Sequence, residues 1–318
     1  MYYWQEKNLK IDSDSKILIG LGDSFTQGQG ACSIELWEKY DWDINKMNLD
    51  ENIDVLESNY ENSWVNLVCN KYLTDFIPIN LGMMGRGNRA SASELFLHPE
   101  LNLESAKEKI VVFMLSGRER FDFVHKEYAE HVHFKTIWPS INDDNTEKDF
   151  FGGYLNYVHS DKSSVIELLL NVSLVKNWCI ANNAKLILVS GFENDINRKS
   201  LIDKIRGVSH DDNTMYREPK RVNGLVDIID WNTFLYPNGS LCVTDLLLSL
   251  EKRDDLIDTV FSVDNFRKLT NSIDKMSTYG YITKCSHPSH KGHEVITEII
   301  YKHIITMGDS LIPKKKIT

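Results

Sequence analysis

A serine stands at the end of an apolar run near the start of the sequence, where a nucleophile or a phosphate site could form. The segment Ile17–Gly30 reads ILIGLGDSFTQGQG, so a strand-like run leads directly into Gly22, Asp23 and Ser24. The carboxyl end of a strand is where an open α/β sheet presents ligands and reacting groups. The residue types therefore predict either a turn that binds phosphate through its backbone N–H groups or a serine displayed for attack on a carbonyl carbon.

The rest of the sequence disfavours a nucleotide site at this turn. A dinucleotide-binding turn has its third glycine where this chain has Phe25, and it needs an acidic residue at the end of the second strand. Here the corresponding segment ends in Asn80, Leu81 and Gly82. A P-loop needs Gly-Lys followed by Ser or Thr, which does not follow this turn. We therefore predict that Ser24 is a nucleophile.

Three segments, in order along the chain, closely resemble motif blocks of the GDSL, or SGNH, esterase superfamily. Gly-Asp-Ser-Phe at 22–25 resembles the first block, NLGMMGRGN at Asn80–Asn88 is similar to the second, and His-Pro-Ser from His287 is similar to the last. The resemblance implies that Ser24 is the nucleophile and His287 its general base. It also implies that the backbone N–H groups of Ser24 and Gly85 hold the oxyanion.

The third block departs from the pattern of the superfamily. The family has Gly-x-Asn-Asp after a strand, and its asparagine side chain donates to the oxyanion. This chain has Arg118 and Glu119 at those positions, within Met114–Phe123. An arginine can donate through five N–H groups. Arg118 is therefore one candidate donor, and Arg120 and Asn88 are the others. Arg118 could instead pair with Glu119 or with an acidic group of the substrate.

The last block departs from the pattern at the residue that orients the histidine. Three residues before His287 the family has an aspartate, and this chain has Lys284, which cannot accept a hydrogen bond from the imidazole. The imidazole is then held either by a backbone carbonyl, in a Ser-His dyad, or by a carboxylate from elsewhere in the chain. The sequence offers three such carboxylates after predicted strands, namely Glu193, Asp195 and Asp230.

The histidine clusters of the sequence do not predict a metal site. The three histidines within His287–His293 would diverge around a helix, because each residue turns by about 100°. His125, His131 and His133 lie near one another without a cysteine or acid at ligand spacing, so we expect them in a polar loop. We expect neither a metal nor a cofactor.

Nearly continuous apolar runs that end in or near glycine predict the strands that position these residues. Such runs are typical of strands covered on both faces, as in a parallel sheet. Helical segments alternate with them, beginning near Asn62, Ser163 and Pro288. The alternation predicts a flavodoxin-like three-layer α/β/α fold with a central parallel sheet of about five strands. The predicted strands are Lys16–Gly22, Phe76–Gly82, Lys109–Gly117, Lys185–Phe192 and Leu225–Asp230, and a further helix is predicted at Asp245–Asp255.

Three stretches fit the alternation poorly and are predicted to be insertions, near 41–61, 120–161 and 193–224. The chain contains no internal repeat and no flexible linker, so we expect residues 1–318 to form a single SGNH-hydrolase-like domain. Long loops at strand ends commonly determine specificity.

The composition limits which partners the protein is expected to bind and where in the cell it is expected to be made. The formal net charge of −10 would repel nucleic acid and anionic membranes, so neither is expected as a partner. The five cysteines form no C-x-x-C pair, and the N-terminus lacks the basic and apolar regions of a secretion signal. These features favour a soluble protein made in the cytoplasm. The most apolar window, Val165–Ile180, is too short and too polar to span a bilayer.

Together these features predict a serine esterase or acyl hydrolase that acts on a small-molecule or glycan ester. Family analogy implies an O-acyl group, such as acetyl, on a carbohydrate or a small polar alcohol. The divergent third block and the insertions are similar to hydrolase-like proteins of phages, which implies a role in modifying host surface glycans or phage components. Lys284 and Arg118 point to an alternative, a weakened or inactive binding or virion protein that keeps the fold. An O-acyltransferase, in which an alcohol replaces water, is a third alternative.

Overall fold

The computed structural model describes residues 9–41, 52–118, 120–124, 134–137, 160–206, 219–253, 280–283 and 287–313. A parallel sheet lies at its centre, with the strand order β2-β1-β3-β6. Four of the predicted apolar runs form these strands, each ending within two residues of the prediction. The strands are β1 (Lys16–Leu21), β2 (Phe76–Asn80), β3 (Glu108–Leu115) and β6 (Lys185–Ser190).

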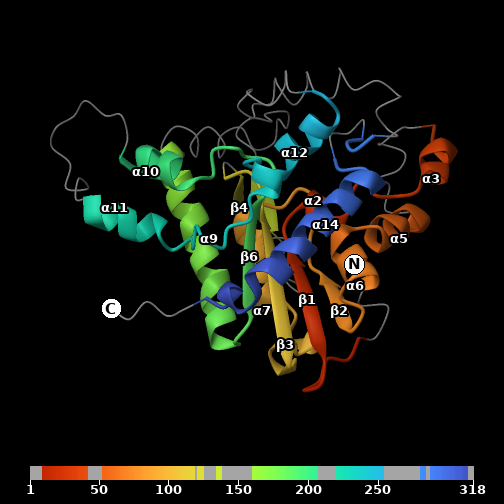
Figure 1. Ribbon diagram of the computed structural model, residues 1–318, viewed down its shortest axis with the longest axis horizontal. Helices are drawn as coiled ribbons and strands as arrows, with labels where there is room; N and C mark the ends of the chain where they lie inside the picture. Colours follow the sequence, from red (N-terminus) through yellow and green to blue (C-terminus); the bar gives the residue numbers. More distant parts are fainter. Residues whose placement is uncertain are drawn as a thin grey trace.

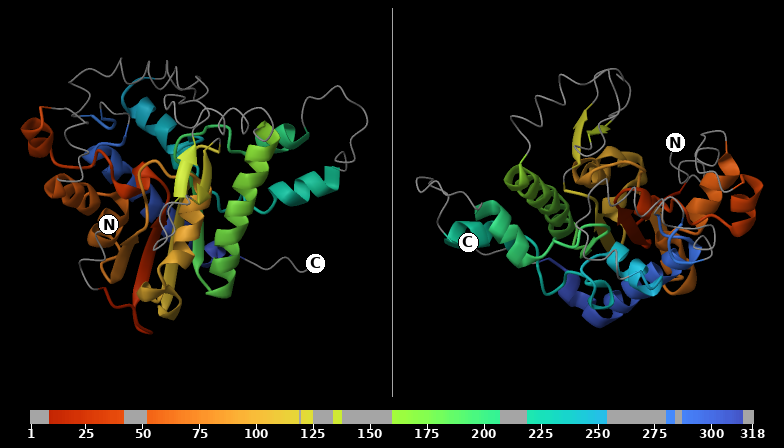
Figure 2. Two further views of the ribbon diagram at one scale, coloured as in Figure 1. Left: turned by 180° about the vertical axis from the view of Figure 1, so that it is seen from behind. Right: turned by 90° about the horizontal axis from the view of Figure 1, so that it is seen from above.

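Helices cover both faces of this sheet (Figure 1). Successive residues of a strand point to opposite sides, so each strand contributes side chains to both faces. Ile17, Ile19 and Leu21 belong to the apolar cluster on one face, and Leu18 belongs to the cluster on the other. The three-layer α/β/α class is therefore confirmed (Figure 2). The first face packs against α7 (Asn88–Leu97), α9 (Asp161–Ala181), α10 (Arg198–Arg206) and α11 (Pro219–Val226), and the second against α6 (Trp64–Lys71), α12 (Val243–Leu250) and α14 (His290–Met307).

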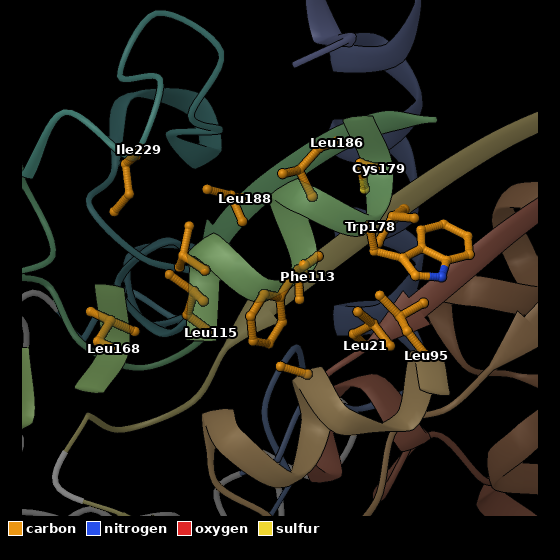
Figure 3. Packing of buried hydrophobic residues seen from close by; sticks show 14 of the residues in the cluster. Leu21, Leu95, Phe113, Leu115, Leu168, Trp178, Cys179, Leu186, Leu188 and Ile229 are labelled. Carbon is orange, nitrogen blue, oxygen red and sulfur yellow. The ribbon is translucent and has the colours of Figure 1, made fainter. Parts of the chain in front are cut away.

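Large side chains fill the first of these interfaces (Figure 3). Phe113 and Leu115 of β3 lie in one cluster with Leu95 of α7 and with Leu168 and Trp178 of α9, and all five are at most 5% exposed. Burial of apolar surface stabilises a fold by about 25 cal/mol per Å². Burial of these side chains therefore stabilises the packing of the sheet against α7 and α9.

The strand register brings the carboxyl ends of the strands to one edge. Gly20 of β1 pairs with Asn80 of β2 and with Val112 of β3, and Val112 pairs with Ile187 of β6. This edge lies toward α2 (Ser24–Gln27) in Figure 1. The predicted serine, glycine and arginine segments all follow strands that end here.

The predicted insertions carry secondary structure of their own. The first contains α5 (Ile53–Glu61), and the second contains an antiparallel pair, β4 (Phe121–Val124) with β5 (Phe134–Ile137). The third contains α10 and α11. The remaining described elements are α3 (Ile34–Lys39) and the 3₁₀ turns η1 (Pro99–Leu101), η2 (Leu103–Ser105), η3 (Pro237–Gly239) and η6 (Gly308–Leu311).

The predicted fifth strand at Leu225–Asp230 is wrong. This segment ends α11 and continues in helical turns, with the backbone N–H of Ile229 donating to the carbonyl of Val226. Val226 and Ile229 are buried three residues apart, so the apolar pattern is that of a helix end. Beside β6 the described chain instead has a single parallel bridge between Leu235 and Val189, and the sheet of described residues has four strands rather than about five.

Three helix starts also differ from the prediction. Pro288 precedes α14 rather than beginning it, because Ser289 is the N-cap and accepts from the N–H of Gly292. Helix α9 begins at Asp161 through a capping box between Ser160 and Ser163, earlier than the predicted start. Helix α12 spans Val243–Leu250, somewhat before the predicted Asp245–Asp255.

Helix α9 is longer than the apolar window Val165–Ile180, which was expected to be too short and too polar to span a bilayer. By length and composition, this 21-residue helix is the one among the described residues that could cross a membrane. Half of its most apolar window is buried inside the protein, where Val165, Leu169 and Val172 face the sheet. Such burial is typical of the core helix of a globular protein.

Candidate active site

Ser24 lies in a tight turn directly after β1. It is the first residue of α2, and the preceding Asp23 caps this helix by accepting from the N–H of Phe25 at 3.1 Å. Gly22 has φ +152°, and a Cβ there would lie 2.8 Å from the carbonyl oxygen of Met114 in β3. The turn therefore needs glycine, and it holds a serine that is only 4% exposed at the edge of the sheet.

His287 meets this serine from the other end of the chain. Its Nε2 lies 2.9 Å from the Oγ of Ser24. The backbone that carries it is fixed, because both the N–H and the hydroxyl of Thr283 donate to the carbonyl of His287, at 2.7 and 3.0 Å. Pro288 adds a bridge to Ile282. The neutral imidazole with its proton on Nδ1 would accept the serine proton at Nε2.

An aromatic ring packs against the histidine of this pair, and a second ring packs against the first. Phe25 packs edge-on against His287 with ring centroids 5.7 Å apart, and against Phe192 at 4.2 Å. Gly30 completes the enclosure: its φ is +93°, and a Cβ there would lie 3.2 Å from the Cβ of His287. The imidazole is thus confined by apolar contacts and by a glycine that allows close approach.

The glycine segment after β2 is joined to the serine turn. The side chain of Asn80 donates to the carbonyl of Thr26 in α2 at 2.8 Å. The N–H of Met83 donates to the carbonyl of Gly22 at 3.2 Å. A Cβ on Gly82 would lie 2.5 Å from the backbone N of Gln27, so the two turns touch at a position that admits only glycine. Ser24 and the glycine segment therefore form one structural unit.

A buried aspartate holds the far end of the glycine segment. Asp122 of β4 is fully buried, and its carboxylate accepts from the N–H of Gly87 at 2.9 Å and from that of Ala90 at 2.8 Å. Thr136 of β5 donates its hydroxyl to the same carboxylate. A carboxylate at the start of a helix is stabilised by the free N–H groups there. The β4-β5 pair, within a predicted insertion, thereby positions the start of α7.

Of the two expected donors in this segment, Gly85 lies at a positive-φ position of the turn and the Asn88 side chain binds the backbone of Ser116. Gly85 has φ +77°, and a Cβ there would meet nothing within 4 Å. The Asn88 amide donates to the carbonyl of Ser116 at 3.0 Å and accepts from its N–H at 2.9 Å. Asn88 therefore ties α7 to the end of β3.

Arg118, the residue at the position of the family asparagine, belongs to an ionic cluster. Its guanidinium binds Glu193 at 3.1 Å and also binds Asp195, and its backbone N–H donates to Glu193 at 3.0 Å. Lys204 of α10 binds Asp195 at 3.0 Å. Burial alone would lower the pKa of Arg118, and the two carboxylates outweigh this and raise it. The structure thus pairs Arg118 with carboxylates after β6.

Arg120, two residues later, lies on the serine side. Its Nη1 donates to Asp23 at 2.6 Å and to the carbonyl of Arg86 at 2.9 Å. Its guanidinium also lies over the ring of Phe192, 5.1 Å from the centroid. Burial raises the pKa of Asp23, which is 1% exposed, and Arg120 counteracts this rise.

The carboxylates considered as partners of His287 have other contacts in the structure. Glu193 and Asp195 bind Arg118, as above, and Asp230 is exposed and accepts from the N–H of Asn232 at 3.1 Å. Lys284 and Glu119 lie outside the described residues.

Two further histidine positions can be placed. His290 is half-buried at the start of α14, and His293 is fully buried, where its Nδ1 accepts from the N–H of Trp64 at 3.2 Å. Burial lowers the pKa of His293 to about 3. Among the described residues no group of three potential ligands could hold a metal ion. His125 and His131–His133 lie outside the described ranges.

A cavity of about 270 Å³ adjoins the segment that carries His287. Gly30, which lies against His287, is part of its wall. Cys32 and Trp37 line it from the side of α3, and Ser289 and Lys291 from the side of α14. The volume is close to the lower end of the range for small-molecule sites, about 300 Å³.

Sequence reasoning did not identify the side chains whose hydrogen bonds fix the backbone around the site. Asn80 entered as the first residue of the second motif block and as evidence against a nucleotide site, without a contact of its own, and Asp122 and Thr283 were not singled out. Asn80 and Asp122 bind backbone groups of distant segments, such as the N–H of Gly87, and Thr283 binds the carbonyl of the nearby His287. Spacing along the chain carries no signal for such contacts. Arg120 was named as a donor, but its link to Asp23 was not foreseen.

No protein-family model matches the chain, and no curated protein matches it. Solved structures do match. Axe2, an acetylxylan esterase from Geobacillus stearothermophilus, is 13% identical with a TM-score of 0.38, over 93% of this chain and 96% of that chain. TesA is 14% identical with a TM-score of 0.37, over 92% and 99%. LAE5, an alpha/beta hydrolase from the metagenome of Lake Arreo in Spain, is 12% identical with a TM-score of 0.37, over 95% and 98%.

The arrangement within the chain itself defines its fold type. The strand order β2-β1-β3-β6 lies between two helical layers. Ser24 follows β1, the glycine segment follows β2, and His287 precedes the helix α14. The chain thus has a three-layer α/β/α fold in which the serine, glycine and histidine segments follow one another in the order that the motif resemblance implies.

Proposed function

We propose that the chain is a serine esterase in which Ser24 is the nucleophile and His287 the general base. The observation that supports this most is the distance of 2.9 Å between Ser24 Oγ and His287 Nε2. Nucleophile and base pairs of this kind lie about 2.6–3.2 Å apart. A structural serine cap would not need an imidazole delivered from 263 residues away.

Acylation begins when Ser24 Oγ attacks the carbonyl carbon of the ester and His287 Nε2 takes the hydroxyl proton. The carbonyl π electrons move to oxygen, and the backbone N–H groups of Ser24 and Gly85 donate to that oxyanion. Collapse of the intermediate breaks the ester C–O bond. His287 then gives its proton to the departing alkoxide, which leaves as an alcohol.

Deacylation repeats these steps with water. His287 removes a proton from water, the resulting hydroxide attacks the acyl-serine, and the same two N–H groups hold the second oxyanion. The serine oxygen leaves with the proton from His287, and a carboxylic acid is released. We propose that a backbone carbonyl orients Nδ1 of His287, in a dyad, because the candidate carboxylates have other partners.

The proposed substrate is an O-acyl ester of a carbohydrate or another small polar alcohol. The cavity beside His287 is small, about 270 Å³, and includes an aromatic residue, Trp37, in its wall. Aromatic side chains offer a flat apolar surface next to a polar edge, which suits a sugar ring. Arg118 takes no part in this proposal, because Glu193 and Asp195 bind its guanidinium.

Hydrolysis of p-nitrophenyl acetate by the full chain tests this function, with acetylated monosaccharides and xylo-oligosaccharides as a second panel. We expect turnover of the aryl ester, and release of acetate from at least one sugar ester. The variant His287→Gln keeps a polar side chain at this position and is the matched control. No turnover of any ester by the wild-type protein would favour the binding-protein alternative, and products acylated on an added alcohol would favour acyl transfer.

A further inference from the structure

The side chain of Arg120 joins the two turns that would supply the oxyanion donors. Its Nη1 donates to Asp23, the residue before Ser24, at 2.6 Å. The same nitrogen donates to the carbonyl of Arg86, the residue after Gly85, at 2.9 Å. One guanidinium group therefore contacts the chain on both sides of the place where the oxyanion would form.

On the serine side, Arg120 acts through a buried carboxylate. Asp23 is 1% exposed, and its other oxygen accepts from the N–H of Phe25 and so caps α2. Because the Asp23 carboxylate caps the helix that begins at Ser24, loss of its position would loosen the turn that holds the N–H of Ser24. A buried carboxylate without a positive partner is costly, so Asp23 keeps this position only while Arg120 is present.

On the glycine side, Arg120 and Asp122 hold the two ends of one peptide unit. The carbonyl of Arg86 accepts from Arg120, and the N–H of Gly87 in the same unit donates to Asp122 at 2.9 Å. The neighbouring Gly85 has no atom within 4 Å of where its Cβ would lie. The shape of this turn therefore depends on hydrogen bonds to its backbone rather than on side-chain packing.

The guanidinium is itself fixed from a third direction. It lies over the ring of Phe192, which also packs against Phe25 at 4.2 Å between centroids. A planar guanidinium can stack on an aromatic ring while donating at its edge, which a lysine ammonium cannot do.

We propose that Arg120 is a positioning residue that sets the spacing between the N–H groups of Ser24 and Gly85. This inference rests on the proposed esterase function and assigns that site a residue outside its catalytic pair. Arg120 acts through Asp23 and Arg86 and does not touch the substrate. Its loss would weaken stabilisation of the oxyanion while leaving the serine, the histidine and the substrate cavity in place.

The test compares Arg120→Met and Arg120→Lys with the wild-type chain, using p-nitrophenyl acetate. Active sites are first titrated with a fluorophosphonate, so that kcat is expressed per reactive Ser24 and unfolded protein does not count. We expect kcat of Arg120→Met to fall about 10²- to 10³-fold, as when an oxyanion donor is lost, with KM changed less than about threefold. Arg120→Lys should recover part of kcat, because it keeps the charge but not the planar fork.

A trifluoromethyl ketone, which forms a tetrahedral adduct with the serine, gives a second readout. Its inhibition constant should rise in Arg120→Met in parallel with the loss of kcat/KM, because adduct and transition state use the same donors. Arg118→Met is the matched control, since it removes a buried arginine two residues away that binds other carboxylates. Its kcat per titrated site should stay within about threefold of wild type.

The double variant Asp23→Asn/Arg120→Met covers the case in which Arg120→Met does not fold, because it leaves no unpaired buried charge. It should show the same loss of kcat per titrated site. Unchanged kcat and inhibition constant in the folded Arg120 variants, or a loss confined to KM, would overturn the inference. A wild-type chain that neither reacts with the fluorophosphonate nor turns over ester would instead reject the proposed function.

Discussion

Two regions of the same sheet edge are built on different principles. The first, the serine edge, comprises the turn at 22–28, the segment 80–88 and His287. The second, the ionic edge, comprises Arg118, Glu193, Asp195, Lys204 and Asp161. The serine edge contains positive-φ glycines, backbone hydrogen bonds and one short contact between a hydroxyl and an imidazole. The ionic edge contains opposite charges that link β3, β6, α9 and α10.

The comparison shows where the residues match the motif blocks and where they depart from them. At the serine edge the glycines that the motif blocks specify have geometric reasons, such as the close approach of Gly82 to Gln27. At the ionic edge an arginine takes the place of the family asparagine and its guanidinium binds acids after β6. We expect changes at the serine edge to affect turnover and changes at the ionic edge to affect stability.

The largest effect is expected from the catalytic pair. Ser24→Ala and His287→Gln should each lower kcat for p-nitrophenyl acetate by about 10⁴- to 10⁶-fold, because each removes the nucleophile or its base. Thermal unfolding should change little, since Ser24 caps no helix. Residual activity of either variant within tenfold of wild type would break the distinction between the two edges.

At the ionic edge, Arg118→Met should lower the free energy of unfolding by about 3–5 kcal/mol, because it leaves Glu193 and Asp195 without their buried cation. Urea denaturation followed by circular dichroism measures this change. The control is Arg198→Met, which breaks a solvent-exposed pair with Asp227 and should leave the denaturation midpoint nearly unchanged. A loss of kcat without a loss of stability in Arg118→Met would move this arginine to the serine edge.

A smaller, mixed effect is expected from Asp122→Asn. One carboxylate oxygen becomes an NH₂ group that faces the N–H of Gly87 or Ala90, so the start of α7 loses an acceptor. We expect a loss of about 1–3 kcal/mol in stability and of about 10-fold or more in kcat, because the glycine segment shifts. Parallel denaturation and kinetic measurements on one preparation check both. Asp122→Glu is a poor control here, since the site is fully buried.

The last prediction is a pH dependence of stability that arises from His293 in α14. Folding lowers the pKa of His293 to about 3, mainly by burial, whereas an unfolded histidine has a pKa near 6.5. The unfolded chain therefore binds this proton below about pH 6.5 and the folded chain does not, so acid favours unfolding. Stability should fall by about 1.4 kcal/mol per pH unit from this residue as the pH drops from 6.5 toward 3.

His293→Gln, which can still accept from the N–H of Trp64, should flatten that slope. Denaturant titrations of both proteins between pH 7 and pH 4.5 measure it. An equally steep slope in the variant would mean that other groups account for the acid sensitivity.

The sequence carried enough information for the fold because apolar patterning is local. Runs such as that of β3 are buried on both faces, and their composition alone indicates a parallel strand. The error at Leu225–Asp230 has the same origin, since a short apolar run at a helix end resembles a strand. Helix starts shifted because caps such as Ser289 and Ser160 compete with neighbouring serines and prolines.

The site was predictable only where the motif blocks name a residue. Ser24, Gly85 and His287 were chosen before any contact was known, and the structure brings Ser24 and His287 within hydrogen-bond distance. Asp122 and Arg120 act on backbone atoms of distant segments, which no spacing reveals. Arg118 stands at the position of the family asparagine, and its long cationic side chain reaches the acids Glu193 and Asp195, which an asparagine could not reach from there.

Mass spectrometry of peptides from the fluorophosphonate-treated chain tests the Ser24–His287 pair most directly. The account predicts one phosphonyl group on the peptide that contains Ser24, none on that peptide in Ser24→Ala, and labelling slowed by several orders of magnitude in His287→Gln. An unmodified Ser24 peptide in the wild-type chain, or modification of a different serine, would contradict it.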